Sequence, residues 1–333
     1  PAPPFDPASF KLYSVRLSVQ APPRNAMLPR NEHTRALAAM VASSAGFSFM
    51  AAMVNVATKA GVTASQATFG RFLAGLGAMC AALALRPQYR QRVREPLWLI
   101  LRGVVGSLAV LAWFATIEPL GLAKASLIAY TYPAFAAILA WPILGERVTP
   151  RLWAALAVAV AGAALLSFQR GRPAASLSNA QEALWSIAAA MGAAASGFAV
   201  CAVRRCRRFE NSFTIYGSQC AFGLLIAVAG MAIETRPEGA SVVPSGAFAW
   251  ALLAAIALSA LAAQLLMTQA YGVLPATEGS LLSLLTPCLN LAAGLLFFGE
   301  SIGWAGALGA LMILSSCVFV SFRRPKPPRI RTV

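Results

Sequence analysis

The chain has 333 residues, of which 59% are hydrophobic and only 11% are charged, and its net charge is +16. This small number of polar side chains cannot cover the surface of a soluble globular protein of this size. The composition therefore predicts a protein that lies in a lipid bilayer. The positive charge does not indicate nucleic-acid binding, because the basic residues lie between apolar runs and sort by side of a membrane.

Ten apolar runs of helical length follow one another along the chain. Each is long enough to cross about 30 Å of hydrocarbon as an α-helix. They are rich in Ala, Leu and Gly and lack the alternation of outer-membrane β-strands. The predicted fold class is therefore an all-α integral membrane protein with ten transmembrane helices, near residues 36–58, 66–85, 98–118, 122–144, 151–168, 183–203, 213–233, 247–271, 276–298 and 303–322.

Lys and Arg residues are unevenly divided between the two sides of this arrangement. With a cytoplasmic N-terminus, 21 of the 27 basic residues fall in cytoplasmic segments and five fall on the opposite side. This bias is the positive-inside signal, so both termini are predicted to be cytoplasmic, in a bacterial inner membrane. The basic tail at 323–333 is also compatible with binding to anionic membrane lipid.

Neither a cofactor nor a metal site is expected. His33 precedes the first run, and the six Cys residues are scattered without CxxC spacing, so they are interpreted as small packing residues. The Pro-rich residues 1–26 predict neither a signal peptide nor a span. Residues 1–35 are predicted to form a disordered cytoplasmic segment.

A set of residues occurs twice in one register, 154 positions apart. The first set consists of Ser126, Leu127, Pro133, Gly145, Glu146, Ser167 and Phe168. The same residue types recur 154 positions later as Ser280, Leu281, Pro287, Gly299, Glu300, Ser321 and Phe322. This register indicates internal duplication. Five runs precede the hydrophilic linker at 169–182 and five follow it. Because five is odd, the second copy enters the membrane from the opposite side and is inverted relative to the first. Two inverted repeats are therefore predicted, at 36–168 and 183–322, with a solute site between them.

The residues around these positions resemble the drug/metabolite transporter superfamily with two EamA-like domains. The resemblance covers residues 36–322. It rests on three segments, which are Tyr130-Thr131-Tyr132-Pro133 through Leu144-Gly145-Glu146-Arg147, Thr286-Pro287 through Phe298-Gly299-Glu300, and Gly70-Arg71-Phe72-Leu73. It implies ten spans and secondary transport of a small solute, such as an amino acid, a nucleotide-like metabolite, a vitamin or a drug, and it favours export.

Pro133 and Pro287 lie near the middles of the fourth and ninth runs. A proline inside a helix removes one backbone hydrogen bond at a cost of about 3 kcal/mol, which leaves the carbonyls of Ala129 and Ser283 without their usual donors. We interpret the two prolines as hinges that line the solute cavity, because the pair is symmetric between the halves. A static kink is the alternative.

Polar side chains are concentrated in the second half, where they share helix faces in the eighth and ninth runs. Their counterparts in the first half are mostly apolar or aromatic, which predicts a pocket with one polar side. Hydrogen bonding between neighbouring helices is the alternative for the Ser and Thr residues. The candidates for the cavity lining are Asn55, Trp113, Tyr130, Tyr132, Gln264, Thr268, Tyr271, Ser283 and Asn290.

Few charged residues lie within or beside the runs. Glu118 and Glu278 are the carboxylates nearest the predicted cavity and the candidates for proton coupling. Arg71 is interpreted as structural, since it lies near enough to the outer interface to snorkel, and a counter-charge for an anionic solute is its alternative role. The Gly-Glu pairs, Gly145-Glu146 and Gly299-Glu300, are interpreted as helix-capping signals.

Two other functions compete with transport. An intramembrane enzyme is not favoured, because the runs contain no paired Asp, no Ser with His or Lys, and no metal-binding cluster. A membrane scaffold or lipid-handling protein would not need polar stripes beside paired prolines. A homodimer is left open.

Overall fold

The computed structural model describes residues 30–60, 62–85, 92–169, 178–233, 246–298 and 303–322. Within these ranges the chain forms helices and no strand, as the composition predicts. The helices are α1 (Arg30–Lys59), α2 (Ala64–Leu85), α3 (Pro96–Ala129), α4 (Tyr132–Leu144), α5 (Pro150–Gln169), α6 (Asn179–Cys206), α7 (Ser212–Ile233), α8 (Ala247–Ala270), α9 (Ala276–Leu282), α10 (Leu285–Phe298) and α11 (Trp304–Ser321).

Eight segments of the described chain are helices long and apolar enough to cross a membrane. Each coincides with one of the ten predicted runs. The fifth run forms a shorter apolar helix, Pro150–Leu165, and the ninth is divided between α9 and α10. The chain is therefore an integral membrane protein, while the number of ten spans stays a prediction.

The boundary between the third and fourth runs differs from the prediction. Helix α3 continues through Pro119 to Ala129. The prediction that one helix ends at 118 and the next begins at 122 is therefore wrong. In the second half the chain does turn between α8 and α9, where Gly272 and Pro275 interrupt it. Pro119 is followed mainly by strong helix formers, which allow the helix to continue beyond it.

The first helix also begins earlier than predicted. Helix α1 begins at Arg30, although residues 1–35 were expected to be disordered. Residues 1–29, most of the linker at 169–182 and the tail at 323–333 lie outside the described residues, and their predicted states stay predictions.

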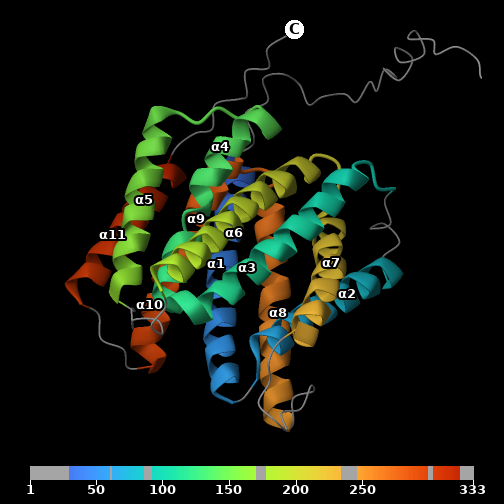
Figure 1. The fold of residues 1–333 in the computed structure, drawn as a ribbon. Helices are drawn as coiled ribbons and strands as arrows, with labels where there is room; N and C mark the ends of the chain where they lie inside the picture. Colours follow the sequence, from blue (N-terminus) through green and yellow to red (C-terminus); the bar gives the residue numbers. More distant parts are fainter. Residues whose placement is uncertain are drawn as a thin grey trace, which may run out of the picture.

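The main pairs of packed helices have equivalent pairs in which both helices are replaced by their counterparts from the other half. Helix α1 packs against α8, and their counterparts α6 and α3 pack against each other. In the same way α4 packs on α6, while α9 and α10 pack on α1. Two further pairs join counterparts directly: α5 with α11 on one side of the molecule, and α2 with α7 on the other (Figure 1). Two copies of one unit produce this pattern.

Small residues allow the paired helices to approach closely. A Cβ added to Gly46 of α1 would stand 2.9 Å from the Cβ of Ala263 in α8, and the nearby Ser43 hydroxyl donates to the Ala263 carbonyl at 2.7 Å. Between α5 and α11, a Cβ on Gly162 would stand 2.6 Å from the Gly309 carbonyl oxygen. Backbone contact therefore fixes the α5–α11 crossing, and the packing of Gly46 on the Ala263 side chain fixes the α1–α8 crossing.

Candidate functional site

A break interrupts the helical path ahead of each of the paired prolines. Residues 130–131 form a turn between α3 and α4, and residues 283–284 form a turn between α9 and α10. Pro133 is therefore in the first turn of α4, and Pro287 is in the first turn of α10. A proline in the first turn costs no helical hydrogen bond, because that N–H would have no partner within the helix.

The backbone at the second break is satisfied locally. The Ser283 carbonyl accepts the N–H of Thr286 at 3.1 Å, so the free carbonyl expected there is wrong, because the helix stops before the proline. At the first break, Thr131 donates both its N–H, at 3.1 Å, and its hydroxyl, at 2.6 Å, to the Ile128 carbonyl. Ala129 is the last residue of α3. The pair of breaks, rather than a pair of free carbonyls, is what the two halves share.

The breaks meet where the halves contact each other. The Tyr132 hydroxyl of α4 donates to the Ser280 carbonyl of α9 at 3.2 Å. The Ser283 hydroxyl, at the second break, donates to the Gly279 carbonyl at 3.0 Å and lies 3.5 Å from the sulfur of Met40 in α1. Helices from both halves thus surround one point.

Three of the sequence candidates follow one face of α8 towards this point. The Thr268 hydroxyl donates to the Gln264 carbonyl at 2.7 Å, which is a bond within the helix and satisfies this hydroxyl. The Gln264 side chain is 3% exposed, and its Nε2 has no hydrogen-bond partner. The hydroxyl of Tyr271, which packs against Gly279, is also buried without a partner. The structure therefore leaves one polar atom of Gln264 and one of Tyr271 buried without a hydrogen bond.

The other sequence candidates are more dispersed. Trp113 lies where α3 crosses α6, since a Cβ on Gly192 would stand 3.9 Å from its backbone nitrogen. Tyr130 packs against the main apolar core, Asn290 is half-buried in α10, and Glu278 is buried in the first turn of α9. The side chains of Asn55 and Glu118 lie outside the described ones, so their roles stay predictions.

Residues 92–95 before α3 and the connections α4–α5, α6–α7 and α8–α9 gather at one end of the bundle, which we call the arginine-rich end. Here Glu146 binds Nε of Arg204 at 3.0 Å through one oxygen and accepts the N–H of Ala276 at 2.9 Å through the other. Nη1 of Arg204 donates to the carbonyls of Tyr271 and Gly272, both at 2.9 Å. Glu146 therefore caps α9 of the other half, rather than only the local helix as expected.

The glycine before Glu146 has the predicted capping role. Gly145 has a φ of 73°, and its N–H donates to the Trp141 carbonyl at 2.9 Å. This left-handed conformation ends α4 and turns Glu146 towards the second half. The corresponding pair, Gly299-Glu300, lies outside the described residues.

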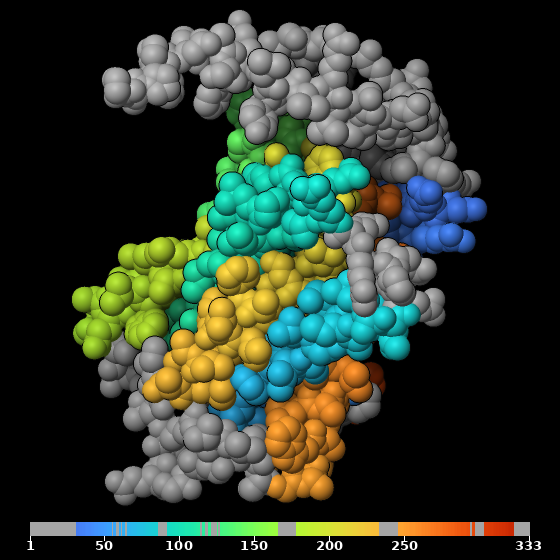
Figure 2. All heavy atoms as spheres, turned by 90° about the vertical axis from the view of Figure 1, so that its right-hand side faces the viewer, coloured from blue at the N-terminus to red at the C-terminus, as the bar shows by residue number. Residues whose placement is uncertain are grey.

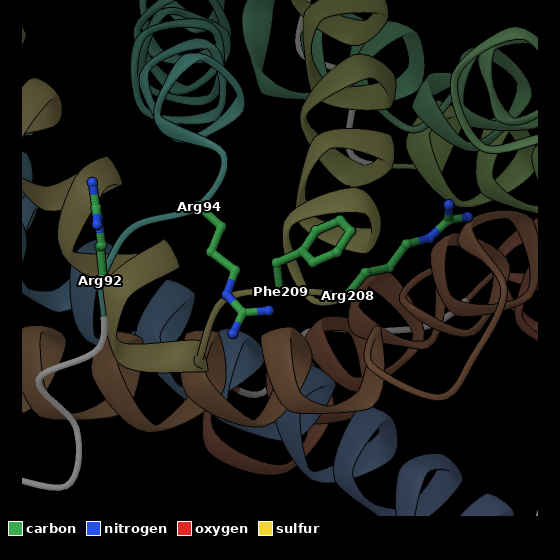
Figure 3. A pocket seen from close by; sticks show the side chains of 4 residues that line it. All are labelled: Arg92, Arg94, Arg208 and Phe209. Atoms are coloured by element: carbon green, nitrogen blue, oxygen red, sulfur yellow. The ribbon is translucent and has the colours of Figure 1, made fainter. Parts of the chain in front are cut away.

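An open hollow of about 430 Å³ also lies at the arginine-rich end. It is lined by Arg92, Arg94, Arg208 and Phe209, whose side chains do not converge on one point, since Arg208 extends away from Arg94 (Figure 3). Burial and the nearby Arg204 lower the pKa of Arg208. The hollow is a wide basic surface rather than a shaped binding site.

The sequence interpretation missed the buried arginines inside the bundle. The snorkelling expected of Arg71 is not observed, because its side chain is buried and lies over the rings of Phe47 and Phe72. Arg102 is one of the 21 basic residues that the sequence assigns to cytoplasmic segments, but it is also buried and donates to Gln219 in α7. Gln219, a polar residue in the middle of the apolar seventh run, was the available signal.

Helices of membrane-spanning length, two halves with exchangeable packing and paired breaks define a polytopic membrane protein built from two related units. The chain belongs to the EamA-like transporter family, whose model matches residues 34–168 and 183–322. The same family model thus matches each half, and the chain is a membrane transporter.

Individual relatives agree with this family. The pseudopaline exporter CntI of Pseudomonas aeruginosa is 26% identical over 282 residues, which are 84% of this chain and 94% of the exporter. A riboflavin transporter of Rhizobium johnstonii is 30% identical over 243 residues, which are 71% of this chain and 75% of that protein. A crystal structure with 20% identity shares the fold at a TM-score of 0.67, covering 88% of this chain and 98% of that one.

Proposed function

We propose that this transporter moves a small solute by alternating access, with two inverted five-span halves rocking about a site between them. One observation carries the proposal: the two interrupted helical paths meet across the halves, where Tyr132 donates to the Ser280 carbonyl. In secondary transporters with inverted repeats, interrupted helices form the solute site near the midplane of the membrane. The polar lining of that site in this proposal is formed by Gln264, Tyr271 and Ser283, together with Asn290 of α10.

The arginine-rich end is the cytoplasmic end of the transporter in this proposal, as its basic residues favour. We call the pair Glu146 and Arg204 the latch. Glu146 belongs to the first half, and Arg204 belongs to the second, so this ion pair has to break before the halves separate on the cytoplasmic side. The latch therefore closes the site to the cytoplasm, and its opening admits the solute.

The solute is amino-acid-like, metabolite-like or drug-like, and the direction of transport is export. Export is supported by the relative that is named an exporter, CntI of Pseudomonas aeruginosa. Glu278, which is buried at the start of α9, is the candidate for proton coupling together with Glu118. Pro133 and Pro287 serve as the hinges beside the paired breaks.

Replacing Gln264 or Asn290 by alanine is expected to lower transport about tenfold, because one hydrogen bond to a bound solute contributes about 1–1.5 kcal/mol. The measurement is uptake into liposomes containing equal amounts of each purified variant. Riboflavin is followed by fluorescence, and a panel of amino acids and nucleosides is followed by mass spectrometry.

Ser315→Ala is the control for these two variants. Its hydroxyl is exposed on α11 and donates to the Met312 carbonyl of the same helix, so uptake is expected to stay normal. If Gln264→Ala and Asn290→Ala both transport at the wild-type rate, the proposed position of the site is wrong.

A further inference from the structure

Two guanidinium groups are buried among the helices of the bundle. Arg71 of α2 is 8% exposed, and Arg102 of α3 is 4% exposed. Both helices pack directly against α7, and the three helices lie side by side on one face of the molecule (Figure 2). A guanidinium in this position is strongly unfavourable unless its charge is compensated.

The contacts of these arginines leave donors unused. Nη2 of Arg102 donates to Oε1 of Gln219 at 2.9 Å, and its Nε has no hydrogen-bond partner. The guanidinium carbon of Arg71 lies 5.9 Å from the ring centre of Phe47 and 5.5 Å from that of Phe72, and its Nε also lacks a partner. The Tyr216 hydroxyl is buried beside Cys220 and Arg71, and both are close enough to interact with it.

Neither charge is balanced by a carboxylate within the described ranges. The ion pairs found there join Arg204 with Glu146 and Arg205 with Glu95, and neither Arg71 nor Arg102 takes part in one. Arg71 is close enough to Arg102 for the two like charges to repel each other. Two like charges in a low-dielectric interior call for an anion.

The pair lies between the two halves of the molecule. Arg71 is the eighth residue of α2 and Gln219 is the eighth residue of α7, so they occupy corresponding places in the two halves. Because α2 and α7 pack together, these residues lie where the halves face each other. A solute that binds between the halves can reach them.

We propose that Arg71 and Arg102 bind an anionic group of the transported solute, a carboxylate or a phosphate. This inference rests on the proposed transport function and names the class of solute. A planar guanidinium binds either group through two parallel hydrogen bonds, and the Tyr216 hydroxyl adds a further donor. A hollow of about 30 Å³, bordered by Phe72 and Ser107, lies between α2, α3 and α7, and neither arginine lines it. It has room for water only, so the solute enters when the halves separate.

The thermal stability of the purified protein tests this site. The melting temperature is measured in detergent with chemically matched probes: glutamate against glutamine, flavin mononucleotide against riboflavin, and inorganic phosphate at about 50 mM, all at constant ionic strength. We expect stabilisation by phosphate and by the anionic member of at least one pair, and little effect of its neutral member. Phosphatidylglycerol is tested separately, in lipid-depleted micelles.

Arg71→Gln and Arg102→Gln provide the second measurement. Each is expected to abolish the anion effect and to raise the melting temperature of the solute-free protein by about 2–4 °C, because each removes an uncompensated charge. Arg151→Gln, an exposed change in α5, is the matched control and is expected to change neither quantity. A lower melting temperature in both glutamine variants would show that the arginines are structural and would overturn the proposal.

Three further outcomes would also contradict the anion site. These are equal stabilisation by the charged and neutral members of both pairs, no effect of phosphate, and stabilisation by phosphatidylglycerol alone. Liposome uptake separates this inference from the transport function. Uptake of neutral solutes without uptake of anionic ones would leave the transporter in place and remove the anion site, whereas no uptake of any solute would count against transport itself.

Discussion

Replacing Glu146 by glutamine is expected to open the arginine-rich end. The change removes the negative charge that binds Arg204 and caps the N-terminus of α9, while it keeps the shape of the side chain. A hydrogen bond between charged groups contributes about 1.5–3 kcal/mol, and a loss of about 2 kcal/mol raises the open population about 30-fold. The thiols of Cys201 and Cys206, which are buried in α6 near Arg204, become accessible in the open state.

The rate of maleimide labelling, measured residue by residue by mass spectrometry, checks this prediction. Cys201 and Cys206 are expected to react about 30-fold faster in Glu146→Gln, in proportion to the open population, while Cys288 in α10 changes little. Glu182→Gln, the same exchange at an exposed position of α6, serves as the control. Unchanged labelling of the α6 thiols would show that the latch does not hold this end closed. Equal acceleration at Cys288 would indicate unfolding instead.

Introducing valine at Gly197 is expected to cause the largest loss of stability. A Cβ at this position in α6 would stand 2.7 Å from the backbone nitrogen of Ala136 and 2.9 Å from the carbonyl oxygen of Tyr132. Backbone atoms cannot rotate away as a side chain can, so α6 has to separate from the first turn of α4. Overpacking commonly costs about 1–3 kcal/mol, and the backbone contacts place Gly197→Val at the upper end of that range.

The fraction of protein that remains monodisperse after heating measures this effect. Gly197→Val is expected to lower the midpoint by about 6–10 °C, and Gly197→Ala by less. Gly77→Ala in α2 is the control, because no atom lies within 4 Å of its added Cβ, and it is expected to be neutral or slightly stabilising. Equal midpoints for Gly197→Val and the wild type would contradict the close approach of α6 to α4.

The sequence predicts those features that have a local or periodic cause. Apolar runs of sufficient length predict the membrane helices, the repeated register predicts two related halves, and Gly145 predicts the left-handed end of α4. The paired prolines indicate where both helical paths are interrupted. Their effect was misjudged by a few residues, because each proline begins a new helix rather than bending one that continues.

Contacts between distant residues are not visible in the sequence. Nothing near Glu146 indicates that its partners are Arg204 and the N–H of Ala276, since the α4–α5 connection meets them only after the halves pack. Arg102 shows the same difficulty. Its position beside a basic connection is typical of a topology signal. Its burial depends on the close approach of α7, which Gly103 permits, and on Gly106, which leaves room for the Arg102 guanidinium.

Counterflow in liposomes distinguishes a carrier that works by alternating access from a membrane protein that does not transport. Vesicles that contain the purified transporter are loaded with an unlabelled solute, and the entry of the labelled solute is followed, starting with riboflavin and glutamate. Alternating access predicts saturable entry that the internal solute accelerates, because the loaded carrier returns faster than the empty one. We expect this acceleration for at least one solute and its loss in Gln264→Ala. Entry that no internal solute accelerates, or that Gln264→Ala leaves unchanged, would contradict this expectation.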